Sequence, residues 1–318
     1  MRRLLLAVAL SVAPAGGYAQ DYPSKAITIV VPNPPGGMNQ IHAQPLSTVL
    51  EKLANQPAPV VNRPGGTAAV GTASVVNAPP DGHTILVTTP NLFLVLEKDK
   101  LYGIKSPYSL DQIALLALLS ADPLIMVVHP SMPVKNVKQL IALAKAKPNE
   151  IVFSSSGPYG ITHMPTAMFL DATGLKMRHL PTTGGGPAIL QALGGHAQVT
   201  GGGPAALYAH IQSGKLRPIA SWGVKPYRAL PNVPTFKSMG IDIEAYLWVG
   251  LFTGANVPEP TRNKMRQLIG KAAADPLFKQ ALEKVQVVPD YRDEPQFRKF
   301  FDADYKRFAA AIQKIGKL

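Results

Sequence analysis

Short runs of β-branched and apolar residues alternate with helical segments in this chain, and this alternation limits the possible folds more than any other feature. The first run, residues 26–31, predicts a strand, and residues 39–53 predict a helix. Strands at residues 59–62 and 83–88, with a helix at residues 70–76 between them, continue the same order. This β-α-β-α-β order predicts an α/β fold whose parallel sheet has helices on both faces.

The pattern begins again in the middle of the chain. Residues 124–129 predict a strand, and residues 137–146 predict a helix with apolar residues at helical spacing. Further strands are expected at residues 151–155, 177–180, 198–200 and 217–222, with helices at residues 162–173 and 188–193. Two such units in one chain predict two lobes with a cleft between them.

The last part of the chain is predicted to return to the first lobe. Residues 245–253 have the composition of a strand, and residues 262–273 and 295–314 carry apolar residues at helical spacing. We therefore expect lobe 1 to comprise residues 20–122 and 244–318, and lobe 2 to comprise residues 123–243.

The N-terminus predicts export. Arg2 and Arg3 precede the apolar residues 4–12, and residues 17–19 place small side chains at the two positions that a signal peptidase reads. The apolar run is far below the roughly 18 residues that span a bilayer. We expect residues 1–19 to be a signal peptide and the mature protein to be periplasmic. The alternative is a buried N-terminal helix.

Composition excludes several classes of site. The chain has no cysteine, so a disulfide framework, a thiolate metal site and a cysteine nucleophile are excluded. Its formal charge is +13, but the basic residues are scattered singly and no basic stripe is interleaved with aromatics, so nucleic acid is not an expected partner. The seven histidines lack metal-ligand spacing, and no cofactor or metal is predicted.

Four loops rich in Gly, Ser and Thr are the candidate binding site. They are residues 34–39, 88–91, 155–160 and 181–186. Ligands of α/β sheets bind at the carboxyl ends of strands, where helix N-termini present free N–H groups. Glycines let backbone amides approach a ligand, and hydroxyls add donors. The loops therefore predict a carboxylate site, although any single one could be only a tight strand–helix connection.

The same loops contain almost no acidic side chain. An amino-acid ligand needs a carboxylate to face its ammonium group, and the first loop offers Asn39 and Gln40 instead. A ligand with acid groups and a neutral body fits better. Met38, Phe93, Tyr159 and Trp248 could line an apolar cleft or could belong to the core.

Enzyme motifs are absent from the sequence. It has no G-x-S-x-G, H-E-x-x-H, P-loop or G-x-G-x-x-G pattern. A serine hydrolase using Ser155 or Ser156 with His163 is the remaining option, without an acid partner nearby. His163 could instead bond local backbone or contact a bound carboxylate. We expect a binding protein and no enzyme.

A series of motifs runs through the mature chain, at residues 22–37, 61–66, 78–84, 128–131, 154–163, 180–186, 213–217 and 230–235. These motifs give the whole mature chain a resemblance to the Bug receptors, the periplasmic substrate-binding components of tripartite tricarboxylate transporters. The resemblance implies a monomer with the two-lobed periplasmic binding protein fold, in which each lobe is a mixed sheet flanked by helices. It also implies a carboxylate ligand held between lobes that close about a hinge, and membrane permease subunits as partners.

The loops and the resemblance together give the predicted ligand-binding residues. They are Pro35, Gly36, Gly37, Met38, Asn39, Thr88 and Thr89 of lobe 1, and Ser156, Gly157, Tyr159, Thr162, His163, Pro181, Thr182, Thr183 and Gly184 of lobe 2.

The chain departs from the Bug pattern at three points. Asn39 or Gln40 replaces an aspartate, Thr182 and Thr183 replace a Tyr-Lys pair, and Gly201 or Gly202 stands at an often acidic position. These changes favour a dicarboxylate or an aromatic carboxylate over an amino acid. A ligand-sensing subunit for a membrane signalling kinase is the alternative to a transport receptor.

Overall fold

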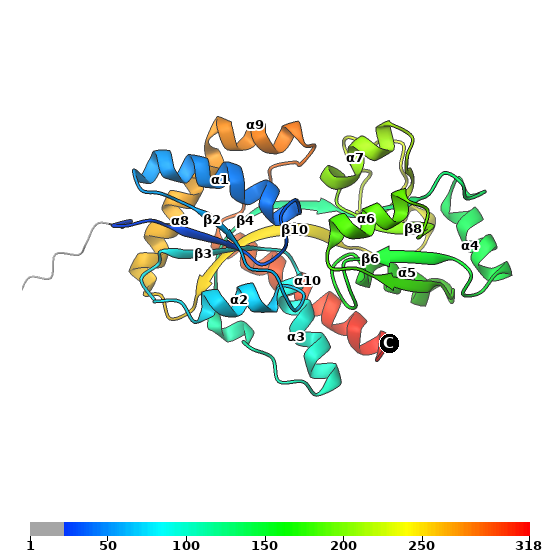
Figure 1. Cartoon of the computed structure of the whole chain (residues 1–318), viewed down its shortest axis with the longest axis horizontal. Helices are drawn as coiled ribbons and strands as arrows, with labels where there is room; N and C mark the ends of the chain where they lie inside the picture. Colours follow the sequence, from blue (N-terminus) through cyan, green and yellow to red (C-terminus); the bar gives the residue numbers. More distant parts are fainter. Residues whose placement is uncertain (1–21) are drawn as a thin grey trace, which may run out of the picture.

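The computed structural model describes residues 22–318, and the predicted signal peptide, residues 1–19, lies outside the described residues. Two five-stranded sheets, each flanked by helices, form two lobes side by side (Figure 1). Within residues 22–318, no helix is both long and apolar enough to cross a bilayer.

Lobe 1 contains a mixed sheet. The strand order is β2-β1-β3-β10-β4; the first three strands run parallel, and β10 runs antiparallel to both of its neighbours. The strands are β1 (Thr28–Val31), β2 (Val60–Asn62), β3 (Thr84–Thr88), β4 (Ile113–Pro123) and β10 (Tyr246–Gly254). Its helices are α1 (Met38–Ala54), α2 (Ala69–Val76), α3 (Asn91–Tyr102), α8 (Glu259–Ala274), α9 (Pro276–Lys284) and α10 (Glu294–Ile315).

Lobe 2 is also mixed, with strand order β7-β6-β8-β5-β9 and β5 antiparallel to both of its neighbours. The strands are β5 (Ile125–Val128), β6 (Val152–Ser155), β7 (Arg178–Pro181), β8 (Val199–Gly202) and β9 (Arg217–Ser221). The helices are α4 (Val137–Ala146), α5 (Met164–Thr173), α6 (Gly185–Leu193) and α7 (Pro204–Gln212), and a short 3₁₀ turn, η2 (Lys237–Met239), follows β9.

The structure confirms the predicted strands and helices and adds elements that the sequence analysis leaves unassigned. Those elements are α3, β4, α7 and α9. Strand β4 has buried side chains on both faces, so it lacks the alternation that marks a half-exposed strand. The return of residues 246–254 to the first sheet is confirmed.

The two crossings between lobes lie next to each other. The chain leaves lobe 1 after β4 and returns into β10, and Tyr246 pairs with Pro123. The backbone N–H of Leu124 donates to the carbonyl of Ala245 at 3.4 Å, and that of Trp222 donates to Leu124 at 3.0 Å. The lobes are therefore joined by two hydrogen-bonded segments, which is the geometry of a hinge.

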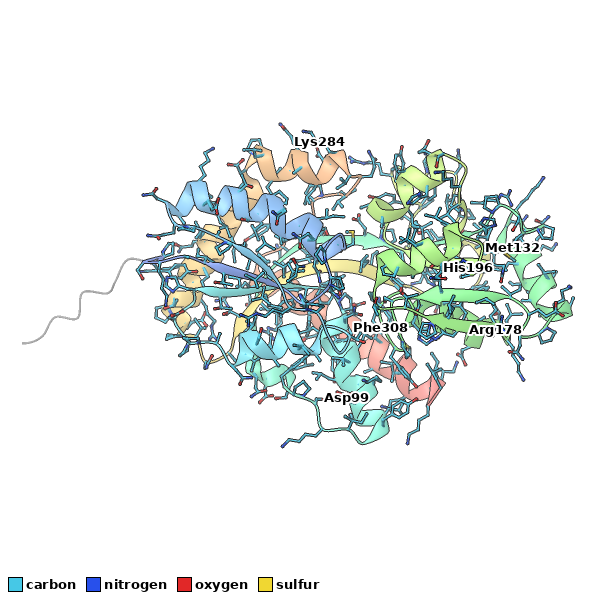
Figure 2. The ribbon with its side chains drawn as sticks, viewed as in Figure 1. Asp99, Met132, Arg178, His196, Lys284 and Phe308 are labelled. Atoms are coloured by element: carbon cyan, nitrogen blue, oxygen red, sulfur yellow. The ribbon has the colours of Figure 1, made fainter. Side chains whose placement is uncertain are left out.

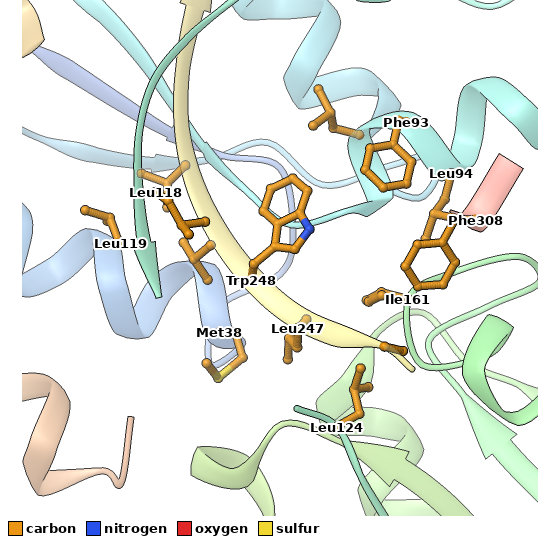
Figure 3. Close-up of a cluster of buried hydrophobic side chains, with 14 of the residues drawn as sticks. Met38, Phe93, Leu94, Leu118, Leu119, Leu124, Ile161, Leu247, Trp248 and Phe308 are labelled. Carbon is orange, nitrogen blue, oxygen red and sulfur yellow. The ribbon is translucent and has the colours of Figure 1, made fainter. Parts of the chain in front are cut away.

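The main hydrophobic core is continuous across the two lobes. Figure 3 shows Leu124 and Ile161, both from lobe 2, near Leu247 and Trp248 of β10, and all four are buried members of one cluster. The indole N–H of Trp248 donates to Asp304 at 2.7 Å. Trp248 and Phe93 thus belong to the core, the second of the two interpretations left open for them.

Substitution of Phe297 tests how α10 packs on the sheet of lobe 1. The buried ring of Phe297 lies 5.7 Å from Trp248 and 5.5 Å from Phe252, measured between ring centroids. Phe297→Ala should lower the free energy of unfolding by about 3–5 kcal/mol because it leaves a cavity. Leu277→Ala, at a side chain that is 54% exposed, should change it by less than about 0.5 kcal/mol. Urea unfolding measures both; equal losses would contradict this account of the core.

Candidate functional site

Among residues 22–318, seven α-helices begin without a side-chain cap, and six of them follow parallel strands of the two sheets. The seventh, α8, follows the antiparallel strand β10 and has Glu259 in its first turn. Helices α1, α2 and α3 follow the parallel strands of lobe 1, while α5, α6 and α7 follow the parallel strands β6, β7 and β8 of lobe 2. None of the six has an acidic residue in its first turn. By contrast, Asn136, Asp275 and Asp293 cap α4, α9 and α10.

Missing caps leave polar groups available. The first turn of an α-helix has N–H groups without helical partners, and the helix dipole places partial positive charge there. Parallel strands bring their carboxyl ends to the same edge of a sheet, so each lobe presents three such helix ends on one edge. This arrangement attracts an anion to both edges.

Contacts between the lobes show that the two edges face each other. The side-chain oxygen of Asn91, at the start of α3, accepts a hydrogen bond from the backbone N–H of Ile161 in lobe 2 at 2.8 Å. A Cβ on Gly157 would lie 4.0 Å from the Thr67 hydroxyl oxygen of lobe 1. A Cβ on Gly203, at the start of α7, would lie 3.7 Å from the sulfur of Met38. We call this junction the interlobe site.

Two of the buried polar atoms of lobe 1 that have no partner among the described residues lie beside these helix ends. They are the Thr88 hydroxyl at the end of β3 and the side-chain oxygen of Asn39 in the first turn of α1. Thr88 is fully buried, and Asn39 is 2% exposed. The amide nitrogen of Asn39 donates to Asn33 at 2.5 Å, which fixes the orientation of the side chain. A buried polar group without a partner is costly. A ligand carboxylate would accept a hydrogen bond from the Thr88 hydroxyl, whereas the Asn39 oxygen is an acceptor and would need a donor such as a ligand hydroxyl.

In the lobe 2 loop between β6 and α5, backbone N–H groups donate hydrogen bonds to side chains of the same loop. The backbone N–H groups of Ser156 and Tyr159 donate to the Thr162 hydroxyl at 2.7 Å and to Nδ1 of His163 at 3.2 Å. The neighbouring turn before α6 is tied to the end of β6, because both the backbone N–H and the hydroxyl of Thr182 donate to the carbonyl of Ser155 at 2.9 Å. Uncapped amides of lobe 2 are therefore found at the starts of α6 and α7.

Tyr159 connects this loop to the end of α10. Its φ of 57° lies in the left-handed region, which is uncommon for a residue with a side chain. Its hydroxyl donates to the carbonyl of Gly316 at 2.9 Å and lies 3.2 Å from the hydroxyl of Tyr102. Beside it, Lys314 of α10 pairs with Asp171 of α5 at 2.6 Å. These contacts hold lobe 2 against lobe 1.

His163 faces the interior of lobe 2. It is 2% exposed, and its ring lies 4.3 Å from that of His179 and 5.8 Å from that of Phe153. Burial, with nearby His179 as a second cause, lowers the pKa of His163 to about 3. Burial lowers the pKa of His179 to about 4. The Ser155 hydroxyl lies 2.7 Å from Nε2 of His179. The structure therefore pairs Ser155 with His179, whereas the sequence analysis considered His163.

The structure brings the predicted residues together as two groups. In lobe 1, residues 35–39 lie beside Thr88 and Thr89 because β1 and β3 are neighbours. In lobe 2, residues 156–163 lie beside residues 181–184 because β6 and β7 are neighbours. Sequence reasoning missed Thr67 and Gly203 as residues of the junction. The glycine pair before Thr67 and the run of three glycines ending at Gly203 were the available signals.

Two α/β lobes joined by adjacent crossings, with helix ends of both lobes facing one another, define a solute-binding protein. Within residues 22–318, no three His, Asp or Glu side chains gather as metal ligands would. Residues 43–317 match the model of the tripartite tricarboxylate transporter family receptor. The chain belongs to this family, which confirms the resemblance to the Bug receptors.

Individual relatives agree with this assignment. The chain is 28% identical to Protein BugT of Bordetella pertussis, over 99% of this chain and 98% of that protein. A solved structure described as a periplasmic transporter superposes with a TM-score of 0.84 at 28% identity and covers 92% of this chain and 98% of its own. The fold is shared with Rpa4515 of R. palustris, solved with adipate, at a TM-score of 0.85, 20% identity and coverage of 93% and 99%.

The lowered pKa of His163 predicts a loss of stability in acid. Its unfolded-state pKa is about 6.5, so unfolding takes up a proton at any pH between 6.5 and the folded value. Stability from this group is complete above pH 6.5 and is lost as the pH falls towards 3. His163→Gln, which keeps an acceptor for Tyr159, should reduce the slope of unfolding free energy against pH by up to about 1.4 kcal/mol per pH unit.

Urea unfolding between pH 4 and 7 measures this slope. The matched control is His196→Gln, because His196 is exposed on the surface of lobe 2. Curves of the same slope for wild type and His163→Gln would show that His163 is not held neutral by its surroundings.

Proposed function

We propose that this receptor captures a small carboxylate in the interlobe site and delivers it to the membrane subunits of a tripartite tricarboxylate-type transporter. The observation that carries the proposal is the facing set of six uncapped helix N-termini without an acidic residue in their first turns. Backbone amides and helix dipoles on both sides would share one anionic group.

The binding step uses the two lobes as separate bodies. We propose that residues 20–122 with 244–318 move against residues 123–243 about the paired crossings. A carboxylate that contacts the α1 end in lobe 1 and the α6 and α7 ends in lobe 2 binds the closed form better than the open form. This differential affinity drives closure. The bonds from Asn91 to Ile161 and from Tyr159 to Gly316 would add to the stability of the closed form.

A dicarboxylate or an aromatic carboxylate is the proposed ligand class. The uncapped helix ends favour negative charge at more than one point, and Asn39 has a neutral side chain that would not balance the charge of an ammonium group. The related fold solved with adipate supports a dicarboxylate. His163 lies behind the loop between β6 and α5, and its ring is buried. A contact between this ring and the ligand stays a prediction.

The proposed location is the periplasm, after removal of residues 1–19. The family assignment and the related periplasmic transporter structure support this location and a partnership with permease subunits. We propose that the receptor works as a monomer. A sensing subunit for a membrane kinase would use the same site with a different partner.

Catalysis by Ser155 with His179 is the second candidate function, because their side-chain contact of 2.7 Å is that of a nucleophile and a base. Two features oppose it. Ser155 is fully buried, and its hydroxyl also lies 3.2 Å from the carbonyl of Gly157. We expect no hydrolysis of carboxylate esters; turnover that is lost in Ser155→Ala would establish the hydrolase instead.

A thermal-shift screen tests the ligand class. It should include adipate, malate, succinate, benzoate and phthalate, with aspartate and glutamate as controls. A ligand at a hundredfold excess over its Kd adds about 2.7 kcal/mol of stability. We expect a clear shift with at least one dicarboxylate or aromatic carboxylate and none with the two amino acids. Stabilisation by aspartate or glutamate would refute the argument from Asn39.

Thr88→Val tests whether the unpartnered hydroxyl serves the ligand. The change removes a buried oxygen without a protein hydrogen bond, so the stability of the free protein should be unchanged or higher. Affinity for the carboxylate found by the screen should fall about 10- to 100-fold, as expected for loss of a hydrogen bond to a charged group. Calorimetric titration and urea unfolding measure the two effects.

Thr253→Val is the matched control for this substitution. Its hydroxyl is buried and donates to the carbonyl of Thr84 at 3.1 Å, so the change should lower stability by about 1 kcal/mol and leave the affinity unaltered. Unchanged affinity in Thr88→Val would show that this hydroxyl does not bind the ligand.

A further inference from the structure

The formal charge of the chain is concentrated in lobe 2. Residues 123–243 contain eleven Lys and Arg and only three Asp and Glu, a formal charge of +8 out of +13 for the whole chain. Lobe 1 therefore carries most of the acidic residues and only a small excess of positive charge. An uneven distribution of this kind favours an acidic partner for the basic part.

The three acidic residues of lobe 2 already have ion-pair partners. Glu150 pairs with Lys147 at 3.1 Å and Asp242 with Lys237 at 3.6 Å. Asp171 pairs with Lys314 of lobe 1. The remaining basic side chains of lobe 2 have no ion pair among residues 22–318, and five of them are exposed around α4 and β7: Lys135, Lys138, Lys145, Lys176 and Arg178. Figure 2 shows Arg178 at the same end of the molecule as α4 in Figure 1.

An apolar groove lies among these charges. It has a volume of about 480 Å³ and is lined by Val137, Lys138, Ile141, Lys145, Thr173, Met239 and Ile241; we call it the α4 groove. Met239 is 38% exposed. The two lysines of the lining lie seven residues apart on α4, about 10.5 Å along the helix axis. The groove thus combines an apolar floor with positive charge at two points.

The groove is remote from the interlobe site. Strand β5 runs antiparallel to β8, so α4, which follows β5, begins at the edge of the sheet opposite the uncapped ends of α5, α6 and α7. An occupant of the groove would therefore leave the ligand site free.

We propose that the α4 groove is the docking site for an acidic amphipathic segment of the transporter's membrane subunits. This inference rests on the proposed transport function. Carboxylates of the segment pair with Lys138 and Lys145, while its apolar side chains cover Val137, Ile141 and Met239. A protein segment fits better than a bilayer surface, because the apolar residues line a concave groove that a flat surface cannot fill.

Direct binding tests the proposal. The full-length mature receptor would be titrated against the purified membrane subunits in nanodiscs of phosphatidylcholine, without carboxylate ligand. Lys138→Glu/Lys145→Glu should raise the Kd at least tenfold, and raising the salt concentration should weaken wild-type binding more than binding of this variant. Both lysines are exposed and have no ion pair among the described residues, so folding should be preserved, as circular dichroism would check.

The matched control is Lys215→Glu/Lys225→Glu. It changes the charge of lobe 2 by the same amount at two exposed lysines that do not line the groove. Its Kd should stay within about threefold of wild type. An equal effect of both double variants would show that only overall charge matters, and no effect of the groove variant would place docking elsewhere. Either result would overturn the proposal and leave the transport function standing.

Two further outcomes separate the remaining possibilities. If the wild-type receptor does not bind the membrane subunits with or without a carboxylate, the transport function fails and the docking proposal fails with it.

Sedimentation with 3:1 phosphatidylcholine–phosphatidylglycerol vesicles tests a membrane occupant. If the wild type binds these vesicles and the groove variant does not, the groove serves an anionic bilayer and the proposed protein segment is wrong.

Discussion

The pairing of β10 with β3 and β4 is the constraint on which the rest of the structure depends. Strand β10 follows all of lobe 2 in the sequence. It lies antiparallel between β3 and β4, two strands that precede lobe 2 in the sequence. Because Tyr246 pairs with Pro123, the outgoing and returning crossings are held side by side. A connection of two adjacent segments lets the lobes approach each other in a defined direction. This pairing acts together with the contacts of Asn91 and Tyr159 between the lobes to place the helix ends of lobe 2 opposite those of lobe 1.

The helix ends of the interlobe site differ chemically from those elsewhere in the molecule. Of the α-helices that begin away from the site, α4, α9 and α10 have an Asn or Asp side chain that satisfies the first amides, and α8 has Glu259 in its first turn. The six that begin at the site have neither a side-chain cap nor an acidic residue in the first turn, and glycine or proline stands at or beside the first residue of α1, α6 and α7. A cap contributes about 1 kcal/mol to a helix, so the omission lowers stability at several points of one junction. Binding of an anion at these helix ends, as proposed, would restore part of that stability.

Some buried polar groups are bonded within the protein, and others near the helix ends of lobe 1 are not. Asp304 is 1% exposed, and this burial raises its pKa to about 6, yet the Trp248 indole and Arg307 both donate hydrogen bonds to it. His42 is fully buried but lies 2.7 Å from the Ser120 hydroxyl and 2.8 Å from the carbonyl of Met38. These groups are satisfied within the protein and help to align α10 and α1 with the sheet. Thr88 and Asn39, close to the helix ends of lobe 1, each retain an unpartnered atom. Unpartnered atoms also occur away from the helix ends, for example on Asp122 and Arg266, so the proposed role of Thr88 and Asn39 rests on their position beside the uncapped helix ends.

The sequence by itself determined the two α/β units, the return of residues 245–253 and the loops of the proposed site, because hydrophobic periodicity and glycine-rich turns are local signals. It left α3 and β4 unassigned, since buried apolar segments of either type look alike in sequence. Only the tertiary structure placed Thr67 against Gly157, paired Ser155 with His179 and turned Tyr159 towards Gly316. It alone also gathered Lys138, Lys145 and Met239 around one groove. These contacts join residues far apart in the chain, and their geometry depends on how two sheets pack, which no local pattern encodes.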